Sequence, residues 1–387
     1  MRSDCTSPLN PDLTVGLSTL NHRCSTYTCV VLDNFTQQLT VGSPLGPEQV
    51  TSAVAALVDE AVPAETKAAF LTALAKKGET TDEIAAFARE LRERSIPVPL
   101  DAATRAREIL DVCGTGGDRL NTFNISTTVA LLCAAAGVTV AKHGNRAITS
   151  QSGSADVLDA LGIPVELTPE QAAASLRDKQ FAFLFAPKFH PAFKHIGPAR
   201  RLCAERGQRT IFNFLGPLLN PARPTAQLVG VPRPELCEPM AKVLQSLGVR
   251  RGMVVCGEVP GSKFQVQGSE TTAFLDELST LGETTVAEFY HDRGFSVSKL
   301  SPQDFPVQPA MLADLEGGDR MANAEIVRRL LAGREQGPRR DAVLLNAGAA
   351  LFLAGRTKSM SEGWLLAAEL LGSGVGIAKL AELSQRS

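Results

Sequence analysis

A short buried strand, a cluster of glycines and a small-residue helix follow one another after residue 107, and this order constrains the fold most. Residues 108–113 have the sequence EILDVC, three glycines lie within 114–117, and residues 126–136 have the sequence STTVALLCAAA. Residues 138–141 (VTVA) complete a strand–helix–strand unit. Further apolar runs lie at 181–186, 225–231, 253–257 and 341–355. The pattern predicts an α/β fold with a mostly parallel central sheet covered by helices.

The segment before this alternation is predicted to be helical. Between residues 47 and 94, apolar residues recur at spacings of three and four, as on one face of a helix. Gly78 ends one predicted helix, and Thr80 begins the next as its N-cap. We therefore expect a small helical domain over 37–105, joined by helices around 190–208, and an α/β domain over 106–387.

Residues 1–36 contain Ser, Thr, Asn and three of the cysteines, but no continuous apolar run of the kind found in a secretory signal. This composition favours a flexible amino-terminal extension. A transit peptide and a start codon placed too far upstream are the alternatives.

Composition excludes several classes of protein. The 387 residues are 44% hydrophobic and 21% charged, without the run of about 20 apolar residues that a membrane span needs. With 39 basic and 41 acidic residues, the net charge of −2 gives no general attraction for nucleic acid or anionic lipid. The eight cysteines form no CxxC pair or Cys/His cluster, which is typical of reduced thiols in the cytoplasm.

Gly114-Thr115-Gly116-Gly117-Asp118 lies between a predicted strand and a predicted helix. Glycines let backbone amides approach a ligand closely, and a helix start adds free N–H groups for an anion. A phosphate-bearing ligand fits this segment, and a tight turn with no ligand is the alternative. The spacing is neither GxGxxG nor that of a P-loop, which disfavours an NAD enzyme and a standard NTPase.

Two further polar segments follow. Residues 121–127 (NTFNIST) open the helix, and ordinary N-capping is the alternative to an anion site there. Residues 142–150 (KHGNRAITS) leave the next strand, at the edge where open α/β sheets bind ligands. His143 alone would more often be a solvated loop residue. If the two strands are neighbours, both loops lie side by side, and an anionic ligand explains them best.

These segments carry a resemblance to a known family. The motifs DVCGTGGD, NIST, KHGNRAITS, GSADVLDALG, TIFNFLGPLLNP and LDELS are similar to those of anthranilate phosphoribosyltransferases, which act in the second step of tryptophan biosynthesis. The similarity covers residues 45–383. It implies a small helical domain, a larger α/β domain, an active site in the cleft between them and a homodimer.

The resemblance also implies a role for individual residues. The site for phosphoribosyl pyrophosphate (PRPP) would comprise Gly114, Gly117, Asp118, Thr122, Asn124, Ile125, Ser126, Thr127, Lys142, His143, Gly144, Asn145, Arg146, Ala147, Ile148, Thr149, Ser150 and Ser154. The anthranilate site would comprise Gly114, Asn145 and Arg200.

Ser126, Asp276 and Glu277 match the family's ligands to two Mg²⁺ ions, and oxygen ligands are those that magnesium prefers. Without that resemblance, an adjacent Asp-Glu pair is more often a helix start or a surface pair. Arg200 would pair with the carboxylate of anthranilate. A surface salt bridge is its alternative role, and Arg201 leaves the assignment ambiguous by one residue.

The implied reaction displaces pyrophosphate from C1 of the ribose by the amine of anthranilate, with no covalent nucleophile and no general base assigned. Two segments are longer than in the family pattern, 202–208 and 259–272, and we read the second as an exposed hairpin or loop. A pyrimidine nucleoside phosphorylase and a non-catalytic nucleic-acid-binding relative are the alternatives. The expected partners are PRPP, anthranilate, a second copy of the chain and an anthranilate synthase component, with no nucleic acid and no membrane.

Overall fold

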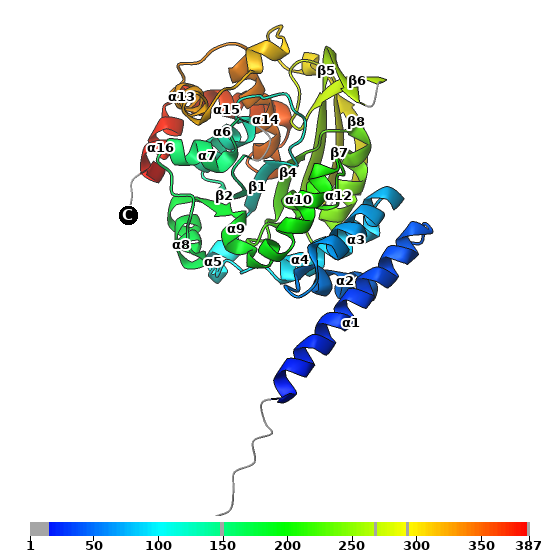
Figure 1. The fold of residues 1–387 in the computed structure, drawn as a ribbon. Helices are drawn as coiled ribbons and strands as arrows, with labels where there is room; N and C mark the ends of the chain where they lie inside the picture. The colour runs from blue at the N-terminus through cyan, green and yellow to red at the C-terminus, as the bar shows by residue number, and fades with distance from the viewer. Residues whose placement is uncertain (1–14, 148–150, 267–268, 292–293, 385–387) are drawn as a thin grey trace, which may run out of the picture. The chain divides into compact units, whose positions relative to one another are not determined.

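The computed structural model describes residues 15–147, 151–266, 269–291 and 294–384. They form two compact units, each drawn in Figure 1. The helical unit takes its residues from Met1–Glu79 and Phe193–Thr210, and the α/β unit from Thr80–Ala192 and Ile211–Ser387. The boundary at residue 79 differs from the predicted boundary at residue 105. The reason is that α4 (Thr81–Glu93) packs against α12 (Cys237–Ser246) of the α/β unit.

The helical unit begins with a long helix where the sequence suggested a flexible extension. Helix α1 spans Val15–Thr40, so residues 15–36 are helical, and residues 1–14 lie outside the described residues. Leu32 and Leu39 are seven positions apart and both are buried, which places them on one face of α1. That face packs against α2 (Pro47–Val58) and α3 (Ala64–Lys77). Burial of this apolar face stabilises the helix.

The later segment of the helical unit carries α10 (Gly197–Glu205), which packs against α3. Lys67 of α3 is 1% exposed, and its Nζ donates to the carbonyl of Asp59 at 2.6 Å and to that of His195 at 2.9 Å. His195 ends the 3₁₀ helix η1 (Pro191–His195), and Asp59 is the C-cap of α2. A cation at a helix C-terminus is favourable, so Lys67 ties the entrance of α10 to α2 and α3. Helix α10 ends at Glu205, and Gly207 follows its C-cap with a φ of 66°, which suits glycine.

The α/β unit is built on one eight-stranded sheet with the order β3-β2-β1-β4-β5-β7-β8, in which β6 pairs with β5. The first five strands of that order are parallel, and β6, β7 and β8 are antiparallel to their neighbours. The predicted, mostly parallel sheet is therefore confirmed. The strands are β1 (Ile109–Gly114), β2 (Thr139–Gly144), β3 (Phe181–Phe185), β4 (Ala226–Gly230), β5 (Arg251–Val266), β6 (Ser269–Leu275), β7 (Thr284–Tyr290) and β8 (Gly294–Leu300).

Side chains of the parallel strands alternate between two apolar layers. On β1, Leu110 and Val112 join the larger core, whereas Ile109 joins the smaller one. The larger core contains residues of α6 (Ile125–Ala135) and of α14 (Pro338–Leu353). Residues 341–353 of the apolar run 341–355 form a helix and not a strand, because an apolar run of this length suits a buried helix.

The other helices of the α/β unit are short or surround these layers, with α13 to α16 grouped around α6 in Figure 1. They are α5 (Ala102–Arg105), α7 (Ser154–Ala160), α8 (Pro169–Lys179), α9 (Ala186–Phe189), α11 (Phe212–Leu215), η2 (Gly216–Leu219), η3 (Pro234–Leu236), η4 (Pro302–Asp304), η5 (Leu312–Leu315), α13 (Arg320–Leu331), α15 (Met360–Gly372) and α16 (Val375–Ser384).

Among the described residues, no single helix is both long and apolar enough to cross a membrane. The pair α15 and α16, bent by 68°, meets the criteria of length and composition only. Trp364, Leu371 and Leu380 of this pair are buried in the core of the α/β unit.

Residues 259–272 were expected to form an exposed hairpin or loop, and their described part belongs to the antiparallel pair β5 and β6. Strand β5 continues to Val266 and pairs with β6 from Val266↔Ser269 back to Gly257↔Leu275. The register shifts between Val259 and Lys263, which marks an irregularity in the hairpin. The hairpin leads directly into Asp276 and so anchors the predicted acidic pair to the sheet.

Candidate functional site

The two predicted loops begin at neighbouring points on one edge of the sheet. β1 ends at Gly114 and β2 ends at Gly144, and these strands are parallel partners. The carboxyl ends of parallel strands share an edge, so the loops that follow start side by side, as the sequence predicted.

The glycine loop after β1 is turned by a series of residues with left-handed backbone conformation. Gly116, Gly117, Arg119 and Asn121 have φ values of 73°, 88°, 61° and 52°. Alternation of this conformation with right-handed or extended residues directs successive amides to one side of a loop, which suits an anion. The N–H of Gly116 donates to Asp276 Oδ2 at 2.8 Å.

Asp276 reaches the end of the sheet only because two positions there lack a side chain. A Cβ on Gly114 would lie 2.1 Å from Asp276 Oδ2, and a Cβ on Gly230 would lie 1.5 Å from the carbonyl oxygen of Asp276. Neither distance is possible between real atoms, so both positions require glycine. Gly230, at the end of β4, is a site residue that sequence reasoning missed.

Glu277 and Lys142 meet at the start of α6. The N–H of Ser126 donates to Glu277 Oε1 at 3.2 Å. Lys142 Nζ donates to the carbonyl of Val112 at 2.6 Å and to Ser126 Oγ at 3.2 Å, and the side chain is 1% exposed. Three segments distant in sequence therefore converge on Ser126.

The acidic residues of the site repel one another. Burial raises the pKa values of Asp118, Asp276 and Glu277, and the charge of Asp276 raises those of Asp118 and Glu277 further. Lys142 is a nearby cation that lowers the pKa values of Asp276 and Glu277. A bound divalent cation would relieve this repulsion.

The donor set here consists of oxygens, from the carboxylates and from the Ser126 hydroxyl, and oxygen ligands suit Mg²⁺. In the described part of the chain, no group of three or more His, Cys, Asp or Glu residues is arranged to hold a metal ion by itself. Magnesium usually keeps several waters and binds through one or two carboxylates plus substrate phosphates. The residues present therefore fit magnesium that arrives with a phosphorylated substrate.

The loop after β2 is held by a residue that was not assigned to the site from sequence. Asp156 Oδ2 accepts the N–H groups of Ala147 at 2.9 Å and Gly153 at 3.0 Å, and Arg146 Nη1 donates to Asp156 Oδ1 at 3.2 Å. Burial opposes the charge of Asp156, but these bonds outweigh it and lower its pKa. Its place three residues after the N-cap of α7 was the available signal.

Other members of the second loop lie as follows. Ser154 lies close to Gly144. A Cβ added to Gly144 would be only 3.0 Å from Ser154 Oγ. Asn145 is exposed, and its Oδ1 accepts the N–H of Arg146 at 2.8 Å. The predicted residues Ile148, Thr149 and Ser150 lie outside the described residues.

His143 is not a solvated loop residue. Its side chain is 7% exposed, its Nδ1 lies 3.2 Å from the carbonyl of Gly216, and its ring centroid lies 5.2 Å from that of His190. Burial, followed by the nearby His190, lowers the pKa of His143 to about 3. The imidazole is therefore neutral, and it carries its proton on Nδ1 because a carbonyl only accepts.

The polar run at the start of α6 divides into buried and partly exposed members. Ile125 and Thr127 are buried, at 2% and 0% exposed, so their side chains belong to the core. Thr122 and Asn124 are half-buried, and Thr122 forms an antiparallel bridge with Glu316. Glu316 and the residues after it had not been assigned to the site from sequence.

Arg200 belongs to the helical unit, on α10. It is half-buried and burial lowers its pKa, whereas Arg201 is exposed. An arginine remains charged at neutral pH despite such a shift. Burial thus distinguishes the two arginines that the sequence left ambiguous.

Comparison with known proteins gives consistent results. Residues 106–377 match the a/b domain of a glycosyl transferase family, and residues 34–95 match the family's helical bundle domain. The anthranilate phosphoribosyltransferase of Geobacter sp. (strain M21) is 47% identical over 327 residues, which are 82% of this chain and 87% of that protein. The corresponding protein of Petrotoga mobilis is 40% identical over 90% of this chain and 95% of its own length.

The chain belongs to the anthranilate phosphoribosyltransferase family.

Solved structures of this family confirm the fold. The anthranilate phosphoribosyltransferase of Thermus thermophilus has a TM-score of 0.78 and 42% identity, over 90% of this chain and 98% of that one. The enzyme of Saccharomyces cerevisiae in complex with PRPP and Mg has a TM-score of 0.78 and 26% identity, over 92% and 97% of the two chains. A helical domain with a larger α/β domain is thus the architecture of this chain and of its anthranilate phosphoribosyltransferase relatives.

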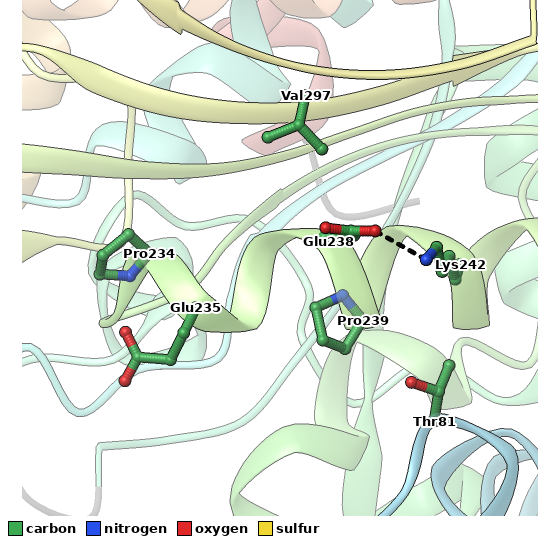
Figure 2. A pocket seen from close by; sticks show the side chains of 7 residues that line it. All are labelled: Thr81, Pro234, Glu235, Glu238, Pro239, Lys242 and Val297. Carbon is green, nitrogen blue, oxygen red and sulfur yellow. Dashed lines mark hydrogen bonds and ion pairs between the residues drawn. The ribbon is translucent and has the colours of Figure 1, made fainter.

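A surface hollow lies apart from the motifs that relate the chain to the anthranilate phosphoribosyltransferase family. The hollow has a volume of about 310 Å³ and is bordered by α12, β8 and the start of α4 (Figure 2). Glu238 and Lys242 form an ion pair at 2.6 Å along its floor, and Val297 of β8 faces them. It contains no predicted site residue. Its lining residues are Thr81, Pro234, Glu235, Glu238, Pro239, Lys242 and Val297.

Proposed function

We propose that this chain transfers the phosphoribosyl group of PRPP to the amine of anthranilate, which gives N-(5-phosphoribosyl)anthranilate and pyrophosphate in tryptophan biosynthesis. One observation carries the proposal. The glycine loop, the start of α6 and the Asp276–Glu277 pair meet at the carboxyl edge of the parallel sheet, through the bonds of Gly116 and Ser126 to these carboxylates. Relatives up to 47% identical bear the name of this enzyme.

The residues around the glycine loop would hold PRPP. Amides of the glycine loop would supply donors for phosphate oxygens, and the dipole of α6 would add to their attraction. Ser154 and Asn145 would complete the site from the second loop. Lys142 lies beneath both loops, so its charge acts on the site through a medium of low dielectric.

Magnesium would be held by Asp276, Glu277 and Ser126, and we propose two ions, bound together with the phosphates of PRPP. The yeast relative has been solved in complex with PRPP and Mg. When bound, magnesium would neutralise charge on the leaving pyrophosphate. The raised pKa values of Asp276 and Glu277 support this role, because a bound cation would stabilise the charged form of both carboxylates.

The protein's own groups would act by binding and orientation. The ribose becomes cation-like as pyrophosphate leaves, so Lys142 and the loop amides would stabilise the developing negative charge on the departing group. Arg200 would bind the carboxylate of anthranilate and direct its amine to C1 of the ribose. The displacement needs no covalent nucleophile, because the amine itself forms the new bond.

The alternatives considered from sequence are less well supported. A nucleoside phosphorylase uses free phosphate and has no need of paired carboxylates beside its glycine loop. A nucleic-acid-binding relative needs a basic surface, which the net charge of −2 does not supply. We also propose a homodimer, an anthranilate synthase component as partner, and a cytoplasmic location, where the free thiols of Cys113, Cys203 and Cys256 would be stable.

The test is a fluorescence assay that follows the disappearance of anthranilate in the presence of PRPP and Mg²⁺, with and without a chelator. We expect consumption only when all three components are present, and we expect excess Mg²⁺ to restore it after chelation. Product analysis should show one pyrophosphate released per anthranilate consumed. Binding of PRPP without any consumption of anthranilate would instead indicate a different acceptor.

A further inference from the structure

The segment 315–318, between η5 and α13, lies against residues 121–123 and forms one wall of the proposed PRPP site. Residues 315–318 run antiparallel to residues 121–123: the N–H of Phe123 donates to the carbonyl of Leu315 at 3.0 Å, and the N–H of Gly317 donates to that of Asn121 at 2.9 Å. The two segments are about 190 residues apart in sequence, and backbone bonds fix them to each other.

Asn323 of α13 links this wall to the start of α6. Its side chain is 2% exposed, its Nδ2 donates to Asn124 Oδ1 at 2.9 Å, and its Oδ1 accepts the N–H of Gly318 at 2.8 Å. A buried carboxamide with both ends bonded is held in one orientation. Asn124 Nδ2 in turn donates to the carbonyl of Ser152 at 3.3 Å, in the second loop.

The bonds to Asn323 and Ser152 engage the side chain of Asn124, which would otherwise cap α6. Asn124 is the N-cap of α6, a position where asparagine normally accepts a bond from one of the first helix amides. Here the Asn124 side chain makes no such bond. Other groups accept from the first amides of α6: the N–H of Ile125 donates to the carbonyl of Phe123 at 2.7 Å, and the N–H of Ser126 donates to Glu277 Oε1 at 3.2 Å.

We propose that Asn323 is a positioning residue for PRPP: by holding the carboxamide of Asn124, it fixes Asn124 between α13 and the second loop in the orientation that binds the substrate. The proposal rests on the proposed function. It assigns a role to a buried residue that contacts no reacting atom and acts through Asn124.

Gly317 supports the same arrangement from the opposite side. A Cβ on this residue would lie 2.6 Å from Asn323 Oδ1 and 2.8 Å from Phe123 Cα. The wall therefore approaches the loop more closely than any other residue would permit. Replacement of Gly317 by alanine should displace Asn323 from Asn124 without removal of a polar group.

The experiment measures steady-state kinetics for both substrates, PRPP binding by calorimetry and thermal unfolding for wild type, Asn323→Ala and Gly317→Ala. In both variants we expect the KM and the Kd for PRPP to rise about tenfold, as for loss of a hydrogen bond to a charged group. The KM for anthranilate should stay within about twofold of the wild-type value, because its proposed partner Arg200 lies in the helical unit.

Asp319→Ala is the matched control. Asp319 caps the same helix, α13, through the N–H groups of Met321 and Ala322, and it is exposed. It should lower thermal stability and leave PRPP binding unchanged. An equal loss of PRPP affinity in this control, or unchanged affinity in folded Asn323→Ala and Gly317→Ala, would overturn the proposal. Wild-type protein that does not bind PRPP would instead refute the proposed function.

Discussion

Single residues of the site are fixed by contacts too close for any substitution. Gly114 and Gly230 end two adjacent strands, and Asp276 occupies the space that their side chains would fill. Asp111 lies on β1, three residues before Gly114, and is fully buried. Its Oδ2 accepts from Asn220 Nδ2 at 2.9 Å and its Oδ1 from the N–H of His143 at 3.3 Å. These contacts connect the floor of the site to the loops above it.

Gly230→Ala should abolish most activity while the protein still folds. The new methyl group would force the Asp276 backbone away from β4, and displacement of a catalytic group by about 1 Å costs roughly 100-fold in rate. Steady-state kcat/KM is the measurement. Gly372→Ala is the control, since no atom lies within 4 Å of its Cβ position. Comparable activity in the two variants would contradict the proposed place of Asp276.

The titration of Asp111 should lower the stability of the folded protein as the pH rises. Burial raises its pKa from 3.8 to about 6 in the folded protein. Between these values the folded state holds a proton that the unfolded state has lost, so this residue makes the protein less stable as pH rises. Below pH 3.8 the carboxyl is neutral in both states, and above pH 6 it is charged in both.

The Asp111→Asn variant lacks this titration. We therefore expect the free energy of unfolding of wild type, relative to Asp111→Asn, to fall by about 2 kcal/mol between pH 4 and pH 6. Urea unfolding at several pH values measures the difference. Parallel pH profiles for the two proteins would show that Asp111 does not titrate in this range.

At the scale of elements, the helices α4 and α6 differ in the groups that accept hydrogen bonds from their first backbone amides. Thr80 closes the start of α4 with a reciprocal capping box to Glu83, at 3.1 and 2.9 Å. The start of α6 lacks such a side-chain cap, although its N-cap is asparagine. At α6 the N–H of Ser126 donates to the carboxylate of Glu277, so a residue distant in sequence takes the place of the local cap.

At the scale of the whole molecule, the two units provide different parts of the proposed reaction. The residues assigned to PRPP and magnesium belong to the α/β unit, whereas Arg200 belongs to the helical unit. Lys67 Nζ donates to the carbonyl of His195, two residues before α10, and Cys203 Sγ of α10 lies 3.6 Å from the carbonyl of Ala68 in α3. The helix that carries Arg200 is therefore packed against α3 of its own unit.

This division predicts a kinetic separation. Arg200→Ala should raise the KM for anthranilate by roughly 10- to 100-fold, the loss of a charge-assisted bond, with little change in PRPP binding. Initial rates with each substrate varied in turn provide the measurement, and Arg201→Ala serves as the exposed neighbouring control. An equal effect of Arg200→Ala on both substrates would contradict its assignment to anthranilate.

The sequence by itself determined the fold class, the family and the loops of the site, because glycine clusters, capping residues and apolar periodicity act over short distances. The sequence did not predict the full order of strands in the sheet. It did indicate that β1 and β2 are neighbours, which the structure confirms. The helix over residues 15–36 was missed, since its stability comes from burial of Leu32 against other helices.

Only the tertiary structure decided which distant residues support the site. Asn323, Gly317 and Gly230 had no signal as site residues until the fold placed them against Asn124, Phe123 and Asp276. It also showed that His143 is buried and neutral, and that Arg200 differs from Arg201 in burial. These properties depend on packing between segments far apart in sequence, and local sequence patterns do not encode such packing.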